Sequence, residues 1–376
     1  MTLKIWIGKR ESDILTYEYF DASITFWGSN TGTNHSFCTI ERLKDNYNAN
    51  FKQFVLEKLE NYINQHDNLE IHFYNNSFAY KIIRENPSLK KYIVNINKQR
   101  IIDIIRHKTL SRVWLQNVVN VPSFMYASKE ECRYDLLINK FPNYKRFVIQ
   151  KCVSGGGTGT YLIDSDNWSE INDNLEKDDV YLVSPYYEKN ISLSCHLLID
   201  DKQVVVFPIS EQLLNYKNNR ISYCGNIYPD ISDNLSNAIK TMATTIGNKL
   251  MSVNYRGICG LDFILTDNKL MLIEINPRYQ GSSYIINAEL RKSNLPSLFF
   301  LNKMCFNGYL KKEIVNKIES MNISYESHNF TYQSEWTNSA ISCPANAKLF
   351  LDGVLNANIF SENVYLYRYL IEVPKK

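Results

Sequence analysis

The sequence predicts an α/β protein in which a small open α/β domain precedes a larger part built from antiparallel hairpins. Strand and helix patterns alternate through the first 100 residues, which favours the open domain. A glycine-rich stretch separates two strand patterns within 148–163, and residues 257–283 contain a second hairpin pattern followed by polar residues. A chain of 376 residues is long enough for two or three subdomains.

The composition narrows the function classes. Net charge is +3, which gives no general case for binding nucleic acid. The eight cysteines show no C-x-x-C spacing and the six histidines show no H-x-x-x-H pattern, so we expect reduced thiols in a cytoplasmic protein and no zinc site. We also expect no signal peptide and no membrane span, because no apolar run approaches about 20 residues.

The elements of the N-terminal part follow from apolar periodicity. The predicted elements are strands at 3–7 and 23–27, a helix over 50–66, a strand at 69–74 and a helix over 77–84. The later predicted elements are helices at 98–116, 232–255, 283–290 and 296–307, and strands at 148–153, 160–163, 180–183, 191–200 and 203–208. The last 70 residues alternate weakly and predict a β-rich cap.

The hairpin within 257–283 places charges on one face. A three-residue loop at 267–269 sets Asp262 opposite Glu274 and Gly260 opposite Asn276. The other face is then wholly apolar and holds Leu261, Phe263, Leu265, Met271, Ile273 and Ile275. Two opposed carboxylates repel each other, so this register favours a bound cation between them. Arg278 follows just past the strand, where it could grip an anion held by that cation.

The glycine-rich stretch is a candidate phosphate cover. Its glycines are Gly155, Gly156, Gly157 and Gly159. They lie between two strands and no G-K-[ST] follows, which argues against a dinucleotide turn and a P-loop. Glycines at a hairpin tip can offer backbone N–H groups to phosphates, and Lys151 lies close enough to assist. A surface hairpin without a ligand remains the alternative.

A break in the strand pattern at Ser184–Glu188 is a candidate site for a purine base. A strand that ends in an extended linker leaves backbone groups free, and Tyr186 and Tyr187 could line a ring. A plain crossover between subdomains is equally compatible with this stretch.

Taken in order, these pieces resemble the ATP-grasp superfamily. The residues that carry the resemblance are Lys108, Val121–Pro122, Lys151 with the SGGGTG loop, the linker 183–188, Asp262, Glu274, Asn276 and Arg278. The E-x-N-P-R form of Glu274–Arg278 looks most like the branch of carbamoyl-phosphate synthetase and biotin carboxylase. The resemblance covers about 101–300.

The resemblance implies an ATP-grasp fold with an N-terminal open α/β domain over 1–100. The ATP-grasp domain would span 101–305, with a β-rich lid at about 120–184 and a core antiparallel sheet at 185–305, and a cap would follow at 306–376. The implied ATP contacts are Lys108, Lys151, Gly155, Gly156, Gly157, Ser184, Tyr186, Tyr187 and Glu188. Asp262, Glu274 and Asn276 would hold Mg²⁺, with Mn²⁺ as an alternative, because hard cations take oxygen ligands.

Arg278 would act on the transferring phosphoryl group, which makes it the implied catalytic residue. Further candidate substrate contacts are Glu211, Gln212, Gln280, Ser282 and Ser283. The sequence departs from the family in two places. Ser184 stands where many members carry an acid, and Asn190 or Ile191 stands where many hold the ribose with an acid.

The resemblance implies a ligase that activates a substrate carboxylate as an acyl phosphate and couples it to an amine, with release of ADP and phosphate. Small-molecule carboxylates and amines from amino-acid, peptide or specialised-metabolite biosynthesis are the expected substrates. Transfer to a carrier-protein thiol and a non-catalytic nucleotide-binding protein are the alternatives. A homodimer is left open.

Overall fold

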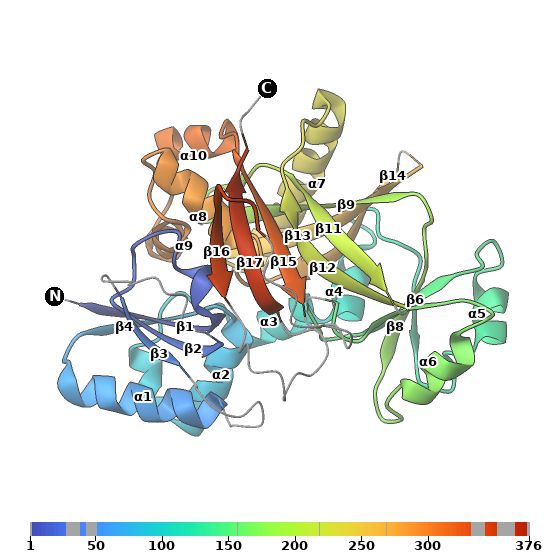
Figure 1. Ribbon diagram of the computed structural model, residues 1–376, viewed down its shortest axis with the longest axis horizontal. Helices are drawn as coiled ribbons and strands as arrows, with labels where there is room; N and C mark the ends of the chain where they lie inside the picture. Colours follow the sequence, from blue (N-terminus) through green and yellow to red (C-terminus); the bar gives the residue numbers. More distant parts are fainter. Residues whose placement is uncertain are drawn as a thin grey trace.

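The computed structural model describes residues 2–27, 38–42, 51–155, 157–217, 219–267, 269–331, 343–351 and 365–373. Figure 1 shows three regions. A small sheet with its helices forms one end of the molecule, a large sheet fills the centre, and a β-rich lobe with α5 (Tyr134–Lys140) and α6 (Trp168–Asn174) projects at the other end. The N-terminal strands and helices are β1 (Leu3–Arg10), η1 (Glu11–Asp13), β2 (Ala22–Trp27), β3 (Thr39–Arg42), α1 (Phe51–Gln65), β4 (Leu69–Phe73), α2 (Asn76–Glu85) and η2 (Pro87–Lys91).

The N-terminal sheet is parallel, with the strand order β3-β2-β1-β4. Its own apolar core joins Ile5, Ile24 and Ile71 of the strands to Val55 and Leu59 of α1. The alternation predicted for strands at 3–7 and 23–27, and the helical spacing over 50–66, are therefore confirmed as local structure.

The predicted helix over 98–116 is wrong in one respect, because it is two helices. They are α3 (Gln99–Arg106) and α4 (Lys108–Leu115), separated at His107, whose backbone is extended with φ −85° and ψ 110°. The His107 ring accepts a hydrogen bond from the Leu110 backbone N–H and so caps the start of α4. The apolar spacing continues across the break, so periodicity alone could not reveal it.

The remaining elements of the described chain are β5 (Met125–Ala127), β6 (Phe147–Lys151), β7 (Thr160–Ile163), β8 (Tyr181–Pro185), β9 (Asn190–Ile199), β10 (Val204–Val206), β11 (Ser210–Lys217), β12 (Arg220–Ile227), α7 (Asp233–Ser252), β13 (Gly257–Thr266), β14 (Lys269–Asn276), α8 (Ser283–Lys292), α9 (Leu298–Asn307), α10 (Lys312–Glu319), β15 (Tyr325–Thr331), β16 (Ala347–Leu351) and β17 (Tyr365–Glu372). Their strands form one large sheet with the path β14-β13-β9-β11-β12-β7-β6-β8-β5.

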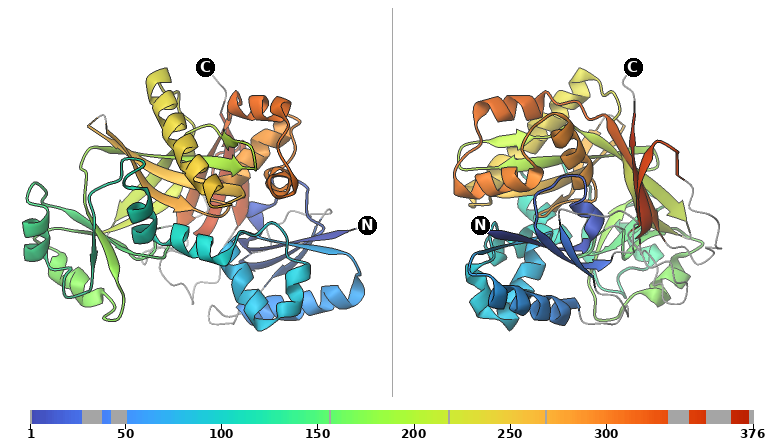
Figure 2. Two further views of the ribbon diagram at one scale, coloured as in Figure 1. Left: turned by 180° about the vertical axis from the view of Figure 1, so that it is seen from behind. Right: turned by 60° about the vertical axis from the view of Figure 1, so that its left-hand side comes forward.

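In the described C-terminal residues, β17 pairs with both β15 and β16, β15 joins β12, and α10 precedes these strands, while the predicted β-rich cap over 306–376 stays a prediction. Helix α7 covers the large sheet on the back, while α3 and α4 run below it toward the N-terminal sheet (Figure 2). One apolar cluster contains Ile102 and Ile105 of α3, Leu115 of α4 and the core faces of β9, β13 and β14. The site described next lies where α4, β14 and the strands β6, β7 and β8 of the β-rich lobe meet, and these three strands are called the lid strands below. The division into domains at 100 and 305 stays a prediction.

Candidate active site

A cavity of about 910 Å³ lies where the N-terminal sheet, the lid strands and the β13–β14 hairpin converge. The lid contributes Val148 and Gln150 of β6 and the loop that follows this strand. The hairpin and the residue just past it supply Asp262, Glu274 and Arg278, and helices α2 to α4 supply further cations. Residues from these segments that line it include Tyr74, Lys81, Lys108, Arg112, Ser154, Gly155, Gly157, Ser184, Tyr186, Tyr187, Gln212, Asp262, Glu274, Asn276, Arg278, Gln280 and Ser282.

The hairpin register is confirmed at the cavity and differs near the loop. Asp262 pairs with Glu274 and Gly260 pairs with Asn276, as predicted, but a bulge follows, and Phe263 pairs with Leu272. Ile273 is the extra residue. The predicted apolar face is therefore wrong at Met271 and Ile273: Leu270 and Leu272 join the apolar core, and Ile273 lines the cavity. A bulge reverses strand parity, so Glu274 leaves the face that Leu272 occupies. Asn268, in the predicted loop, lies outside the described residues.

Side-chain amides surround Asp262. Gln212 Nε2 donates to its Oδ1 at 3.0 Å, Gln280 Nε2 donates to the same oxygen at 3.2 Å, and Asn276 Nδ2 donates to its Oδ2 at 2.7 Å. Burial, followed by the nearby charge of Glu274, raises the pKa of Asp262 to about 8. A bound cation would lower this pKa again, because it favours the ionised carboxyl, so the opposed pair still suits a cation.

Glu274 has a cationic partner. Lys108 Nζ lies 2.6 Å from Glu274 Oε2, and Lys108 is 4% exposed. Burial acts to raise the pKa of Glu274, but the Lys108 charge and hydrogen bond outweigh it, so the pKa lies below its usual value. The Lys108 ammonium also donates to the carbonyl oxygen of Ser154 at 3.1 Å. One lysine thus joins the acidic hairpin to the start of the glycine-rich loop.

The N-terminal part of the chain positions Arg278. Its Nη1 donates to Tyr74 Oη at 3.2 Å and to the Tyr279 carbonyl oxygen at 2.9 Å, while Nη2 donates to Asn276 Oδ1 at 2.9 Å. An isolated β-bridge also joins Asn75 to Arg278. A Cβ built on Gly155 would lie 3.1 Å from Arg278 Nη2, so the glycine-rich loop closely approaches the guanidinium.

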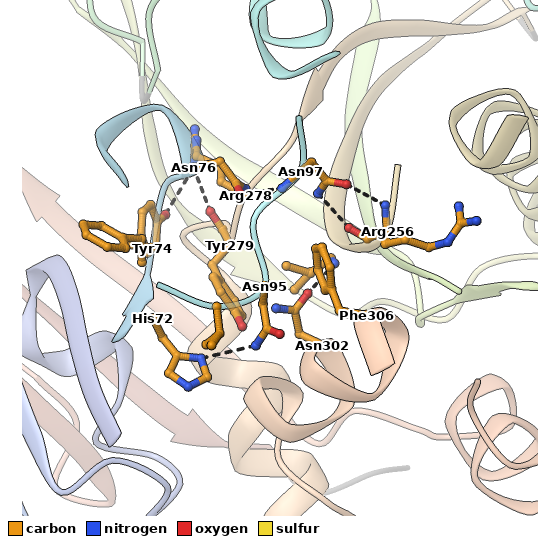
Figure 3. Close-up of a pocket in the computed structure, with 13 residues that line it drawn as sticks. His72, Tyr74, Asn76, Asn95, Asn97, Arg256, Arg278, Tyr279, Asn302 and Phe306 are labelled. Atoms are coloured by element: carbon orange, nitrogen blue, oxygen red, sulfur yellow. Dashed lines mark hydrogen bonds between the residues drawn. The ribbon is translucent and has the colours of Figure 1, made fainter. Parts of the chain in front are cut away.

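Figure 3 shows the asparagine-rich seam that keeps this part of the chain in place. Asn97 pairs with the Arg256 backbone in both directions: its Nδ2 donates to the Arg256 carbonyl oxygen at 2.8 Å, and its Oδ1 accepts from the Arg256 N–H at 2.7 Å. Asn76 Nδ2 donates to the Pro277 carbonyl oxygen at 3.1 Å, directly before Arg278. The Asn76 contact anchors the start of α2 to the chain just after β14, and the Asn97 contacts anchor the chain before α3 to the residue before β13.

Strand β6 does not direct Lys151 into the cavity. Val148 and Gln150 line it, whereas Ile149 lies in the apolar core of the lid and Lys151 forms ion pairs with Glu176 at 2.6 Å and Asp179 at 2.8 Å. Side chains alternate along a strand, so Gln150 faces the ligand side and Lys151 faces away. In this arrangement Gln150, which the sequence did not single out, lines the cavity next to the predicted Lys151, and the ATP contact of Lys151 stays a prediction.

The described part of the glycine-rich loop lies against β12. Gly157 has φ +84°, and a Cβ there would lie 2.2 Å from the Ile221 carbonyl oxygen. Only glycine fits both that conformation and that approach. Gly155 and Gly157 line the cavity, whereas Gly156 lies outside the described residues.

The linker begins later than the sequence indicates, because β8 continues through Ser184 and Pro185 to pair with Val148 and Phe147 of β6. Ser184, Tyr186 and Tyr187 line the cavity. Glu188 does not: it is 61% exposed, and its carboxylate accepts from Arg146 at 3.1 Å.

The five candidate substrate contacts separate into two groups. Gln212, Gln280 and Ser282 line the cavity. Ser283 and Glu211 are not among the described residues that line it, and the Ser283 hydroxyl instead contacts His196 Nε2 at 2.9 Å and accepts from the Gln280 N–H at 2.8 Å.

Two further residues were missed besides Gln150. Arg112 lines the cavity one helical turn after Lys108, and the i,i+4 spacing was a usable signal. Tyr74 carried no such signal, because it approaches Arg278 from 204 residues away in sequence. Among the described residues, no group of three or more His, Cys, Asp or Glu side chains could hold a metal ion, which leaves the carboxylate pair with Asn276 as the candidate. No helix in the described ranges is both long and apolar enough to cross a membrane.

Comparisons with known proteins agree with this arrangement. Residues 105–282 match the family model of an ATP-grasp domain. The chain is 24% identical over 195 residues to a [Butirosin acyl-carrier protein]–L-glutamate ligase of Niallia circulans, a match that covers 48% of this chain and 45% of that relative. The chain therefore spans less than half the length of this curated relative.

Solved structures show the same fold at low identity. The biotin carboxylase domain of Hydrogenobacter thermophilus 2-oxoglutarate carboxylase, solved as a dimer with MgADP, ADP and bicarbonate, has a TM-score of 0.68 at 13% identity and covers 100% of this chain and 87% of its own. An L-amino acid ligase from Bacillus licheniformis has a TM-score of 0.64 at 11% identity, and the match covers 99% of this chain and 93% of the ligase. The family match contains the lid, the linker and the acidic hairpin, and residues 105–282 are therefore an ATP-grasp domain.

Proposed function

We propose that the chain is an ATP-dependent ligase that activates a carboxylate as an acyl phosphate and joins it to an amine. The observation that carries the proposal is the opposed pair of Asp262 and Glu274, with Asn276 and Arg278 beside it, in the cavity that the linker and glycine-rich loop also line. The fold and the similarity to carboxylate ligases support this assignment.

The donor set fits Mg²⁺, with Mn²⁺ as an alternative. Asp262 and Glu274 offer carboxylate oxygens on one face, and Mg²⁺ typically takes few protein ligands and completes its shell with water and phosphate oxygens. Asn276 turns its side-chain nitrogen to both carboxylates here, so it would coordinate through its oxygen only with the amide group reversed. When bound, the metal would neutralise the triphosphate and hold the phosphoryl group for in-line transfer. Lys108, now on Glu274, is placed to contact phosphate as well.

The bond changes follow from this geometry. A substrate carboxylate oxygen attacks the γ-phosphorus while the bond to ADP breaks, and Arg278 stabilises the equatorial oxygens where charge develops. The amine then attacks the acyl carbon, and phosphate leaves. Ser184–Tyr187 would receive the adenine, and Gln150 would contact the nucleotide from the lid.

The test is an ADP-release screen against pools of carboxylates and amines, with mass spectrometry of the product. With an ¹⁸O-labelled carboxylate, one label should appear in the released phosphate, because the acyl phosphate leaves with a carboxylate oxygen. Phosphate without label would contradict the acyl-phosphate step. Nucleotide binding without ADP release in any pool would favour a non-catalytic nucleotide-binding protein.

A carrier-protein thiol is the second candidate acceptor, and one observation favours it. Lys81 and Arg106 line the cavity, and their side chains make no hydrogen bond or ion pair with the part of the chain that the structure describes. Phe51 and Phe78, stacked at 5.3 Å between ring centroids, line the same region. Free cations beside an aromatic wall suit the phosphodiester and apolar arm of phosphopantetheine, and the curated relative is named for a carrier-protein substrate.

The two acceptors give separable results. If a carrier arm binds there, the double variant Lys81→Glu, Arg106→Glu should raise KM for a phosphopantetheinylated carrier and leave KM for ATP unchanged. The exposed charge reversal Lys90→Glu is the control. Unchanged kinetics with the carrier, or no turnover of it by the unmodified protein, would leave free amines as the substrates.

Location and assembly belong to the same proposal. An enzyme that consumes ATP works where the nucleotide is maintained, so we propose the cytoplasm. The dimeric state of the carboxylase domain makes a homodimer worth testing, and light scattering after gel filtration would decide it.

A further inference from the structure

Arg112 is a buried cation that the proposed reaction does not use. It is 2% exposed and lines the cavity. It forms no ion pair with any carboxylate in the described ranges, and its hydrogen bonds go to neutral oxygens: Nη1 donates to Ser184 Oγ at 2.7 Å, and Nε donates to the Ile273 carbonyl oxygen at 3.2 Å. An unpaired buried charge is costly to folding, so its retention points to a role in the site.

One of the two acceptors is the bulged residue of β14. Asp262 pairs with Glu274 and Phe263 with Leu272, so Ile273 has no partner across the ladder. The extra residue of a bulge is left unpaired, and Arg112 satisfies its carbonyl group. Without the bulge, strand alternation would put Glu274 on the same face as Leu272, which lies in the apolar core. The bulge is therefore what presents Glu274 to the cavity.

Two residues on one face of helix α4 contact two consecutive residues of β14. Lys108 and Arg112 are one turn apart, and they contact Glu274 at 2.6 Å and Ile273 at 3.2 Å. The segment after α4 contacts the preceding residue of β14, because the Leu272 N–H donates to the Asn120 carbonyl oxygen at 2.9 Å. The position of the Glu274 carboxylate thus depends on this segment.

The other acceptor belongs to the base-binding side of the cavity. Ser184 is buried at the next-to-last position of β8. Pro185 and Tyr186 follow it, and all three residues line the cavity. A planar guanidinium offers several donors in a fixed geometry, so it can hold two elements at once. A lysine has a single ammonium and cannot reproduce that planar fork.

We propose that Arg112 is a positioning residue that couples the nucleotide linker to the metal-binding hairpin. Its fork fixes the Ile273 bulge and the end of β8, just before the linker, in one arrangement, so that base binding at Ser184–Tyr187 and metal binding at Glu274 support each other. The proposal rests on the proposed nucleotide and metal sites, and it adds a dependence of one upon the other.

The test measures ADP affinity by calorimetry with and without Mg²⁺, for the unmodified protein, Arg112→Lys, Arg112→Met and Ser184→Ala. We expect Mg²⁺ to raise ADP affinity in the unmodified protein. In both Arg112 variants that metal-dependent gain should fall by about tenfold, the effect of one charged hydrogen bond. In Ser184→Ala, ADP should bind more weakly while Mn²⁺ affinity, read by electron paramagnetic resonance, should change less than in the Arg112 variants.

Controls separate coupling from loss of fold. Arg133→Met removes an exposed arginine that pairs with Asp135 and should change neither affinity. Millimolar guanidinium should partly restore the metal-dependent gain in Arg112→Ala, which a merely unfolded variant would not show. Equal weakening of ADP with and without Mg²⁺ would overturn the coupling. If the unmodified protein binds no MgADP, the proposed function fails instead.

Discussion

The two hairpins that flank the cavity differ in how they offer their chemistry. The β13–β14 hairpin presents side chains, and contacts from α4, β11 and the β4–α2 junction hold Glu274, Asp262 and Arg278 in place. The β6–β7 hairpin presents backbone at Gly155 and Gly157, and its lysine is occupied outside the cavity by Glu176 and Asp179. The difference indicates that charge is concentrated on the core side, while the lid contributes shape and N–H donors.

The largest effect should come from Glu274→Gln, which removes a carboxylate of the proposed metal site from the β13–β14 hairpin. A neutral amide binds Mg²⁺ poorly and leaves Lys108 without its carboxylate partner. Turnover with the true substrates should fall by about 1,000-fold, equivalent to several kcal/mol of barrier. The measurement is ADP release across a Mg²⁺ titration, with Glu188→Gln, an exposed glutamate, as the control. Turnover like that of the unmodified protein would remove Glu274 from the metal site.

A somewhat smaller effect is expected at Arg278. Arg278→Ala should lower kcat by about 100-fold, because the guanidinium acts on charge that develops in the transition state. ATP affinity should change far less. Tyr74→Phe removes one acceptor for Arg278 and should lower kcat by only about threefold, as loss of a single hydrogen bond does. Equal losses in kcat and in ATP affinity for Arg278→Ala would assign it to ground-state binding.

The lid hairpin offers a sharper test, because neighbouring residues face opposite ways. Gln150→Ala should weaken ADP binding by about fivefold, whereas Lys151→Ala should leave it within about twofold. Calorimetry with MgADP gives both values under one set of conditions. The reverse order would mean that Lys151 leaves Glu176 and Asp179 when nucleotide binds, and that the lid supplies charge as well.

The smallest effect concerns stability without metal. The pKa of Asp262 is raised to about 8 from 3.8 by burial and by Glu274. A carboxyl whose folded-state pKa is raised gives stability that is complete below pH 3.8 and is lost as the pH rises through 8. Asp262→Asn should therefore unfold at a higher temperature than the unmodified protein at pH 8 in EDTA, with the gap closing toward pH 5. A gap independent of pH would show that the charge is not its cause.

Much of the core-side site was predictable because its signals are local. Strand alternation and one polar face set Asp262 against Glu274, and the same register brought Asn276 to the cavity. The lid side was less predictable. A strand pattern over 148–153 does not say which of its two faces lines the cavity. In the fold, Ile149 packs in the apolar core of the lid, and Lys151 on the same face pairs with Glu176 and Asp179 in the loop after α6.

The sequence by itself determined the order of the segments, the opposed carboxylates and the family, because these depend on local periodicity and on short motifs. Only the tertiary structure decided the break at His107, the bulge at Ile273, and the contacts of Arg112 and Tyr74. The physical reason is that these four features satisfy backbone groups or charges with partners far away in the chain, which at the His107 break is the Cys152 carbonyl oxygen that accepts from the Lys108 N–H at 2.8 Å. Such partners leave no periodic trace at the position that they stabilise.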